Sequence, residues 1–183
     1  MRTMLFAVLS GTGLIMFQPA IGTEHEIRRE SLRPLTGVHV VLAGVDDVLD
    51  GHVVGSDLAT RLELRLRRSG VPVLAKTDLK KVESPASLSL GVNALPVNDE
   101  RLSFALAIQL NLNQLAVIGS EETGLQAVEA ETWRTSRLAI FGLTTIREGA
   151  VNDAVDAMAD EFINAWLASH PPSPAGSSKS SKP

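Results

Sequence analysis

The densest group of chemically capable side chains lies between residues 46 and 57, and its members are Asp46, Asp47, Asp50, His52 and Asp57. Asp46, Asp50 and Asp57 match positions 1, 5 and 12 of a calcium-binding loop. Position 3 is Val48, which has no ligand oxygen, and position 12 is usually a glutamate. The pattern supplies too few oxygens for calcium. A weak cation site on these three aspartates, a contact loop for a partner, and a solvated loop that caps the next helix all stay open.

Three arginines share one side of the helix predicted for residues 57–69. Arg61, Arg65 and Arg68 follow one another at spacings of four and three residues, which places them on one helix face. Such a stripe could meet an anionic lipid or an acidic partner. If both long helices cover the same sheet face, however, it runs beside an acidic stripe on the last helix, which consists of Asp153, Asp156 and Asp160.

Three further residues are candidates for contact with a partner. Trp133 lies in a polar strand between a threonine and an arginine. Its indole could pack under a helix, stack on an arginine or anchor an interface. Glu121 and Glu122 lie at the turn of the hairpin predicted for the middle of the chain. We therefore expect the hairpin turn and Trp133 to contact a partner.

The sequence contains no arrangement that singles out a catalytic residue. Cysteine is absent, which excludes cysteine nucleophiles, cysteine-ligated metals and disulfides. The four histidines form no closely spaced metal pair. The G-x-S-x-G elbow and the phosphate-binding G-x-x-x-x-G-K-S/T loop are both missing. We expect no cofactor and a protein that is not an enzyme.

Charge and composition narrow the classes of partner. The 183 residues include 17 Lys and Arg against 21 Asp and Glu, a formal net charge of −4, and only 4% are aromatic. An acidic chain with few aromatic side chains argues against nucleic-acid binding. After the first 22 residues, no uninterrupted apolar run is long enough to span a membrane.

The first 22 residues have the pattern of an export signal. Arg2 precedes an apolar run from residue 4 to residue 17, and Ala20 and Gly22 supply small residues before a cut at Thr23. An uncleaved anchor is the alternative. We predict that the signal is removed and that the mature protein is periplasmic or secreted.

The rest of the chain divides by composition into three parts. Residues 23–34 form a charged lead-in, residues 35–170 a single folded domain, and residues 171–183 a tail of Pro, Ser, Gly and Lys. A segment with so little apolar surface cannot offset the entropy of ordering, so we predict that the tail is disordered.

The folded domain is predicted to contain one sheet and two covering helices. In chain order the elements are strand 38–45, helix 57–69, strands 71–75, 86–92, 101–113 and 127–141, and a helix that ends near residue 169. The first strand–helix–strand unit requires parallel strands, and the later hairpins are antiparallel. We predict an α/β protein, α+β by the stricter definition. It is a two-layer sandwich in the order β-α-β-β-β-β-α, with a mixed sheet of about five strands and both helices on one face.

Three short segments resemble small exported bacterial proteins of unknown function. They are Leu66–Val73 (LRRSGVPV), Thr132–Trp133, and Phe162–Leu167 (FINAWL) before His170–Pro171. The layout of the elements is also similar to the small α/β domains of envelope assembly factors, of the CsgG, LpoB and TolB N-terminal kind. No functional residue is transferred by this resemblance.

Two functions follow from these observations. The first is an exported, non-enzymatic accessory or binding protein of the cell envelope, with a protein partner. The second is a small-molecule or cation binder, or a hydrolase, that uses the loop from Asp46 to Asp57.

Overall fold

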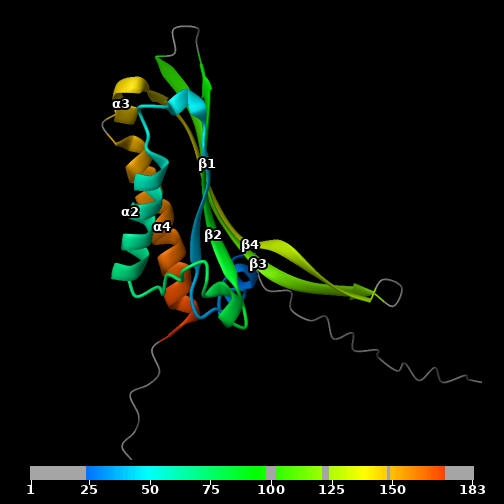
Figure 1. Cartoon of the computed structure of the whole chain (residues 1–183). Coiled ribbons are helices and arrows are strands. Elements are labelled where there is room, and N and C mark those ends of the chain that lie inside the picture. Colours follow the sequence, from blue (N-terminus) through cyan, green and yellow to red (C-terminus); the bar gives the residue numbers. More distant parts are fainter. Residues whose placement is uncertain (1–23, 98–101, 121–123, 148, 172–183) are drawn as a thin grey trace, which may run out of the picture.

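The structure is a computed structural model that describes residues 24–97, 102–120, 124–147 and 149–171. The predicted signal at residues 1–22, Glu121, Glu122 and nearly all of the predicted tail lie outside these residues. Within them the chain is α/β, with one mixed sheet and several helices (Figure 1). The strands are β1 (His39–Val45), β2 (Ala86–Pro96), β3 (Ser103–Ser120) and β4 (Gly124–Gly142). The α-helices are α1 (Glu24–Glu30), α2 (Gly55–Arg68), α3 (Leu143–Arg147) and α4 (Ala150–Ser169).

The four strands lie in the sheet in their chain order. β1 and β2 are parallel, with α2 between them in the sequence, and the two later pairs are antiparallel. The predicted strand at residues 71–75 is reduced to a single bridge between Val38 and Val73. Pro72 has no N–H to donate, which limits pairing at this point. The expected fifth strand is therefore not confirmed among the described residues.

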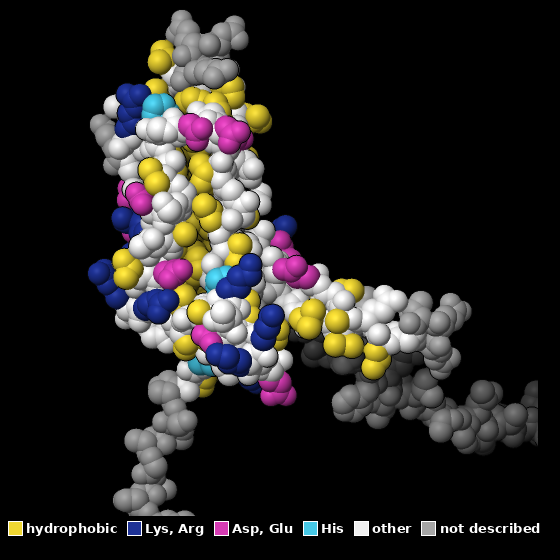
Figure 2. Space-filling view, viewed as in Figure 1, with side chains coloured by type: hydrophobic (Ala, Val, Ile, Leu, Met, Phe, Trp, Pro, Cys, Tyr) yellow, Lys and Arg dark blue, Asp and Glu magenta, His cyan; other side chains and the backbone are white. Residues whose placement is uncertain are grey.

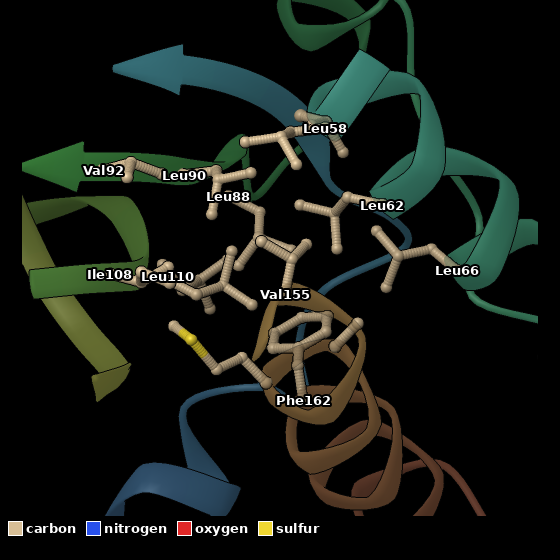
Figure 3. Close-up of a cluster of buried hydrophobic side chains, with 14 of the residues drawn as sticks. Leu58, Leu62, Leu66, Leu88, Leu90, Val92, Ile108, Leu110, Val155 and Phe162 are labelled. Atoms are coloured by element: carbon tan, nitrogen blue, oxygen red, sulfur yellow. The ribbon is translucent and has the colours of Figure 1, made fainter. Parts of the chain in front are cut away.

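The core lies between the sheet and the two long helices, which occupy the same side of it (Figure 1). Even-numbered residues of β3 point toward the helices, and Leu106, Leu110 and Leu112 are fully buried. They pack with one face of α2 and with α4 (Figure 3), and the labelled side chains include Leu58, Leu62, Leu66, Leu88, Leu90, Val155 and Phe162. Burial of each such leucine contributes about 1.5–3 kcal/mol to stability.

The predicted lead-in at residues 23–34 is part of this packing. Residues 24–30 form α1, which contacts α4 and β4. Leu32, just after α1, is fully buried in the core. The packed part of the chain therefore begins before residue 35.

The last helix is divided in two. The sequence predicts one helix from the region of Thr144 to Ser169, whereas the structure has α3 and α4. Gly149 separates them with a φ of 107°, in the left-handed region that glycine adopts without steric cost. The break lets α4 start in a new direction along the sheet.

A bulge separates the two halves of the long β3–β4 hairpin. Leu112 pairs with Trp133, but the next pair is Asn113 with Glu131, so that Thr132 has no partner in the ladder. The Gln114 side chain donates to the Thr132 hydroxyl at 2.7 Å. The odd-numbered apolar residues after Leu112 predict an extra residue near Asn113–Gln114 that would restore the apolar face. The bulge is present, but its extra residue, Thr132, is on β4, so β3 keeps its alternation and Leu115 and Val117 lie on the face opposite Leu112.

Beyond the bulge the hairpin projects from the body and is here called the arm (Figure 1). The arm comprises residues 115–120 of β3 and 124–129 of β4, whose six pairs run from Leu115–Glu129 to Ser120–Gly124. The ladder between β2 and β3 ends at Ala86–Gln114, one residue before the arm begins. The arm is thus a two-stranded ribbon next to a four-stranded sheet.

Candidate functional site

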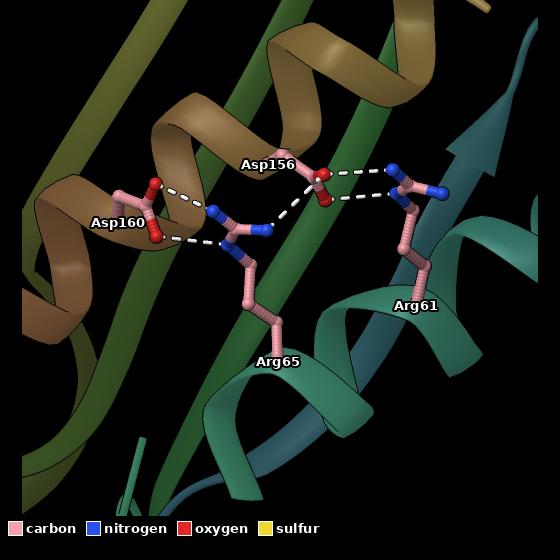
Figure 4. Close-up of polar contacts among 4 residues, drawn as sticks. All are labelled: Arg61, Arg65, Asp156 and Asp160. Atoms are coloured by element: carbon pink, nitrogen blue, oxygen red, sulfur yellow. Dashed lines mark hydrogen bonds and ion pairs between the residues drawn. The ribbon is translucent and has the colours of Figure 1, made fainter. Parts of the chain in front are cut away.

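The arginine stripe of α2 is paired with the acidic stripe of α4. Arg61 donates from Nε and Nη2 to Asp156 at 2.8 and 2.7 Å, and Arg65 donates in the same way to Asp160 at 2.8 and 2.6 Å (Figure 4). Nη1 of Arg65 also lies 3.2 Å from Asp156. We call these four residues the Arg–Asp ladder. It confirms the interpretation that the two stripes lie alongside each other.

Hydrogen bonding shifts the protonation equilibria of the ladder. The hydrogen bond that Arg61 donates to Asp156 raises the pKa of Arg61, with a further contribution from the charge of the same carboxylate. The hydrogen bond with Asp160 raises the pKa of Arg65, and the hydrogen bond from Arg65 lowers the pKa of Asp160. These side chains are 20–51% exposed, so each pair contributes only about 0.5–1 kcal/mol. The ladder joins two helices and leaves little charge for a partner.

Arg68 is the member of the stripe that stays outside the ladder. In the part of the chain that the structure describes, it makes neither a hydrogen bond nor an ion pair. It lines an open depression of about 590 Å³ together with Leu64 and the ladder residues. A single cation beside a neutralised stripe gives little basis for an anion site.

The loop from Asp46 to Asp57 does not bring its carboxylates together. Asp46 caps the short helix at Asp47–Leu49 by accepting a hydrogen bond from the N–H of Val48 at 3.1 Å. Asp57 lies elsewhere, beside His52 in a depression of about 160 Å³. Among the described residues, no three carboxylate or histidine side chains are placed to hold a metal ion. Asp50 is exposed. The loop connects the end of β1 to the start of α2.

Trp133 is buried in the core, with 7% of its surface exposed. Its ring meets Phe162 of α4 edge-on, with a centroid separation of 5.1 Å. Such aromatic pairs add about 0.5–1.5 kcal/mol beyond the area they bury. Of the roles open to Trp133 on sequence grounds, the structure places it in packing under a helix.

A depression of about 750 Å³ lies between α1, β4 and α4, near the base of the arm. Its lining includes Arg28, Arg29, Arg134, Glu161 and Asn164. Arg28 donates to the backbone oxygen of Arg134 at 3.0 Å, and Glu161 accepts hydrogen bonds from Thr135 and Arg137. The side chains mainly fasten α1 and α4 to β4. Sequence reasoning missed this depression because α1 lies about a hundred residues from β4 in the chain.

The arm exposes apolar side chains of the kind that a folded protein normally buries. Leu115 is 57% exposed, Val117 is 65% exposed and Leu125 is 84% exposed. Figure 2 shows such side chains along the arm, away from the helices. All three lie on the same face of the ribbon, because Leu115, Val117 and Gly119 share one face of β3 and Leu125 pairs with Gly119. A second exposed group, at the far end of the sheet, contains Leu95, Leu138 and Ile140.

Sequence reasoning identified the turn of this hairpin and missed the arm's faces. The signal was available in the charge pattern. Residues 102–133 contain no lysine or arginine and four glutamates, at positions 121, 122, 129 and 131. An apolar hairpin of this length without a cation is unusual for a solvated surface.

No family model matches the chain, and no curated protein matches it significantly. Two similar solved structures are a minor lipoprotein from Acinetobacter baumannii and a candidate lipoprotein from Caulobacter crescentus CB15. The first is 13% identical, covers 73% of this chain and 92% of its own, and has a TM-score of 0.34. The second is 16% identical, covers 79% and 98%, and has a TM-score of 0.37. TM-scores this low establish neither a shared fold nor a function, and the resemblance to envelope assembly factors stays a prediction.

Among the described residues, no helix combines the length and apolarity needed to cross a membrane.

Proposed function

We propose that this chain is an exported, non-enzymatic binding protein of the cell envelope and that it contacts a protein partner through the arm. Export rests on the charged start, the apolar run and the small residues of the first 22 positions. The binding role rests on one observation above all. Leu115, Val117 and Leu125 project from the body with more than half of their surfaces exposed.

The energetics of the arm support a binding role. An isolated two-stranded hairpin is marginally stable in water, because neither of its faces is packed. Exposed apolar side chains gathered on such a ribbon gain about 25 cal/mol for each Å² that a partner covers. A partner that covers the arm would therefore supply the stabilisation that the core supplies to the rest of the sheet.

Photo-cross-linking in native envelopes tests the proposal. A cross-linking residue placed at Val117 or Leu125 is expected to give a discrete adduct. The same residue at Leu138 is the matched control, since Leu138 is 82% exposed and lies on the same strand as Leu125, which is 84% exposed. Equal adducts from the arm and from Leu138, or none from the arm, would overturn the proposal.

Cell fractionation tests the export part separately. The mature protein is expected outside the cytoplasm with Thr23 as its first residue, which N-terminal sequencing can establish. A full-length chain in the cytoplasm would contradict it.

A further inference from the structure

We infer that the partner binds by adding a basic β-strand to the free edge of β3 in the arm, at residues 115–120. This inference rests on the proposed function and specifies the chemistry of the partner. The occupant is an extended segment of another protein, in which lysine or arginine alternates with apolar residues.

The free edge of β3 is a consequence of where β2 begins. β2 covers β3 as far as Gln114, which pairs with Ala86. Beyond that pair, residues 115–120 pair with β4 on one side, and no strand among the described residues pairs with them on the other. An incoming strand would lie beside β3 in the position that β2 occupies in the body. It would form backbone hydrogen bonds with residues 115–120 like those that β2 forms with the rest of β3.

The edge of β4 at the base of the arm is better protected. Arg28 of α1 donates to the backbone oxygen of Arg134 at 3.0 Å, and the Ser31 hydroxyl lies 3.4 Å from the backbone oxygen of Thr132. The bulge at Thr132 further interrupts pairing on this side. These contacts lie at the base of β4; within the arm, the β4 edge at residues 124–129 carries Glu129, whereas the β3 edge at residues 115–120 carries no charge and accepts a strand without displacing α1.

The β3 edge lacks the devices by which proteins prevent strand addition. Such devices are lysine or other charges on the edge, proline, and bulges. The segment Leu115-Ala-Val-Ile-Gly-Ser120 contains none of them, and the β2–β3 and β3–β4 ladders show no bulge within it. Unlike the base of β4, which α1 contacts, this segment has a composition that permits another strand to pair with it.

Charge selects a basic partner over the other occupants. Residues 102–133 carry four glutamates and no cation, and of these Glu131 is ion-paired with Arg134 at 3.7 Å, which leaves Glu121, Glu122 and Glu129 as the acidic residues of the segment. A second copy would bring a second acidic arm, and like charges at close range oppose pairing. A lipid bilayer is disfavoured because Glu121 and Glu122 lie, by sequence, in the connection that would enter it. The C-terminal stretch that carries Lys179 and Lys182, residues 175–182 (AGSSKSSK), does not alternate lysine with apolar residues and so lacks the apolar side chains of the proposed strand.

A strand peptide provides the direct test. The probe is a fluorescent peptide of about seven residues in which lysine and valine alternate, which is a typical strand length. A glutamate–valine peptide controls for charge, and a backbone N-methylated lysine–valine peptide controls for strand hydrogen bonding. Binding to the mature chain is followed by fluorescence anisotropy.

The expected result is binding of the lysine–valine peptide, with at least about tenfold weaker binding of both control peptides. Binding should also weaken as salt rises, because the charges involved are exposed. Leu115→Lys should reduce affinity about tenfold, whereas Leu138→Lys should change it less than about twofold. Circular dichroism of both variants establishes that each is folded.

Equal binding of the lysine and glutamate peptides, or an equal effect of the two leucine substitutions, would overturn the inference. So would a dimer held together by the arm in light scattering, because a second copy would then occupy the edge. If arm residues cross-link in envelopes but no basic strand peptide binds, the inference fails while the proposed function stands. If the arm gives no adduct, the proposed function fails.

Discussion

β3 and β4 each run from the body of the protein into the arm, and the two halves of each strand differ in environment. In the body half of β3, Leu106, Leu110 and Leu112 are fully buried under α2 and α4. In the arm half, Leu115 and Val117 are 57% and 65% exposed. Both halves contain apolar residues, but they differ in two ways: the helices cover only the first half, and the apolar side chains of the second half lie on the odd-numbered face, opposite the face that carries Leu106, Leu110 and Leu112. The comparison teaches that an alternating strand specifies an apolar face, whereas its covering is specified elsewhere in the chain.

The contrast extends to the charges. On the body, the Arg–Asp ladder pairs cations and anions within the molecule. On the arm, residues 115–120 and 124–129 include Glu129 and no lysine or arginine. On its helix-covered face the body thus pairs its charges and buries its apolar side chains, whereas the arm does neither, and the opposite face of the body also exposes Leu95, Leu138 and Ile140.

Hydrogen exchange should give the largest difference. Backbone amides in the buried half of β3 are expected to exchange only through openings that approach the free energy of global unfolding, which is about 5–15 kcal/mol in typical domains. Amides of residues 115–120 should open with free energies of no more than about 2 kcal/mol, because neither face is packed. Exchange followed by mass spectrometry or NMR measures both halves in one sample. Equal protection would mean that the arm is covered in solution.

Core truncation should show the next largest effect. Leu110→Ala removes a fully buried side chain and should cost about 2–5 kcal/mol of unfolding free energy. Leu115→Ala, five residues along the same strand, should change stability by less than about 0.5 kcal/mol. Urea denaturation followed by circular dichroism compares the two. Similar losses would show that the arm packs against something in the isolated protein.

The Arg–Asp ladder should have a smaller effect that depends on pH. Because Arg65 lowers the pKa of Asp160 below its value in the unfolded chain, the contribution of Asp160 is complete above the unfolded-state pKa. It is lost as the pH falls through the lower folded-state pKa. Asp160→Asn should therefore cost up to about 1 kcal/mol near neutral pH, and the difference from the wild type should shrink below about pH 4.

Asp153→Asn is the control for this experiment, since Asp153 is exposed on the same helix and acts on Arg61 only through its charge. Urea denaturation at a series of pH values is the measurement. A cost for Asp160→Asn that stayed constant down to pH 2 would contradict the role of the ion pair.

Removal of the arm should have the smallest effect on stability. A chain in which a two-residue Asn-Gly turn replaces residues 115–129 should keep its melting temperature within a few degrees, because the arm contributes little to the core. The same chain should no longer bind the lysine–valine peptide. A large fall in melting temperature would show that the arm stabilises the body and would contradict the contrast between the two regions.

Much of the body could be predicted from the sequence. The strict alternation from Leu102 to Leu112 identified the buried strand, and the spacing of Leu58, Leu62 and Leu66 identified the covered face of α2. Both patterns reflect local periods, which a sequence displays directly. The pairing of Arg61 and Arg65 with α4 was one of the open alternatives, since it depends on two helices sharing a sheet face.

Other features could not be predicted because they depend on distant segments. The strand predicted at residues 71–75 is reduced to the bridge between Val38 and Val73, because Pro72 beside it has no N–H to donate to a ladder. The break at Gly149 was missed because glycine is also tolerated within helices. The depression at Arg28 and Arg134 requires α1 to return to β4 from the far end of the chain.

The sequence alone determined the alternating strands, the amphipathic helices, the absence of disulfides and the acidic character of the segment from residue 102 to residue 133. Each of these follows from residue type and spacing. Only the tertiary structure decided which apolar residues are core and which form the arm. β3 pairs with β2 only as far as Gln114 and the helices lie over the body, so the even-numbered face of β3 is buried in the body, whereas the apolar residues of the arm, on the odd-numbered face, stay exposed.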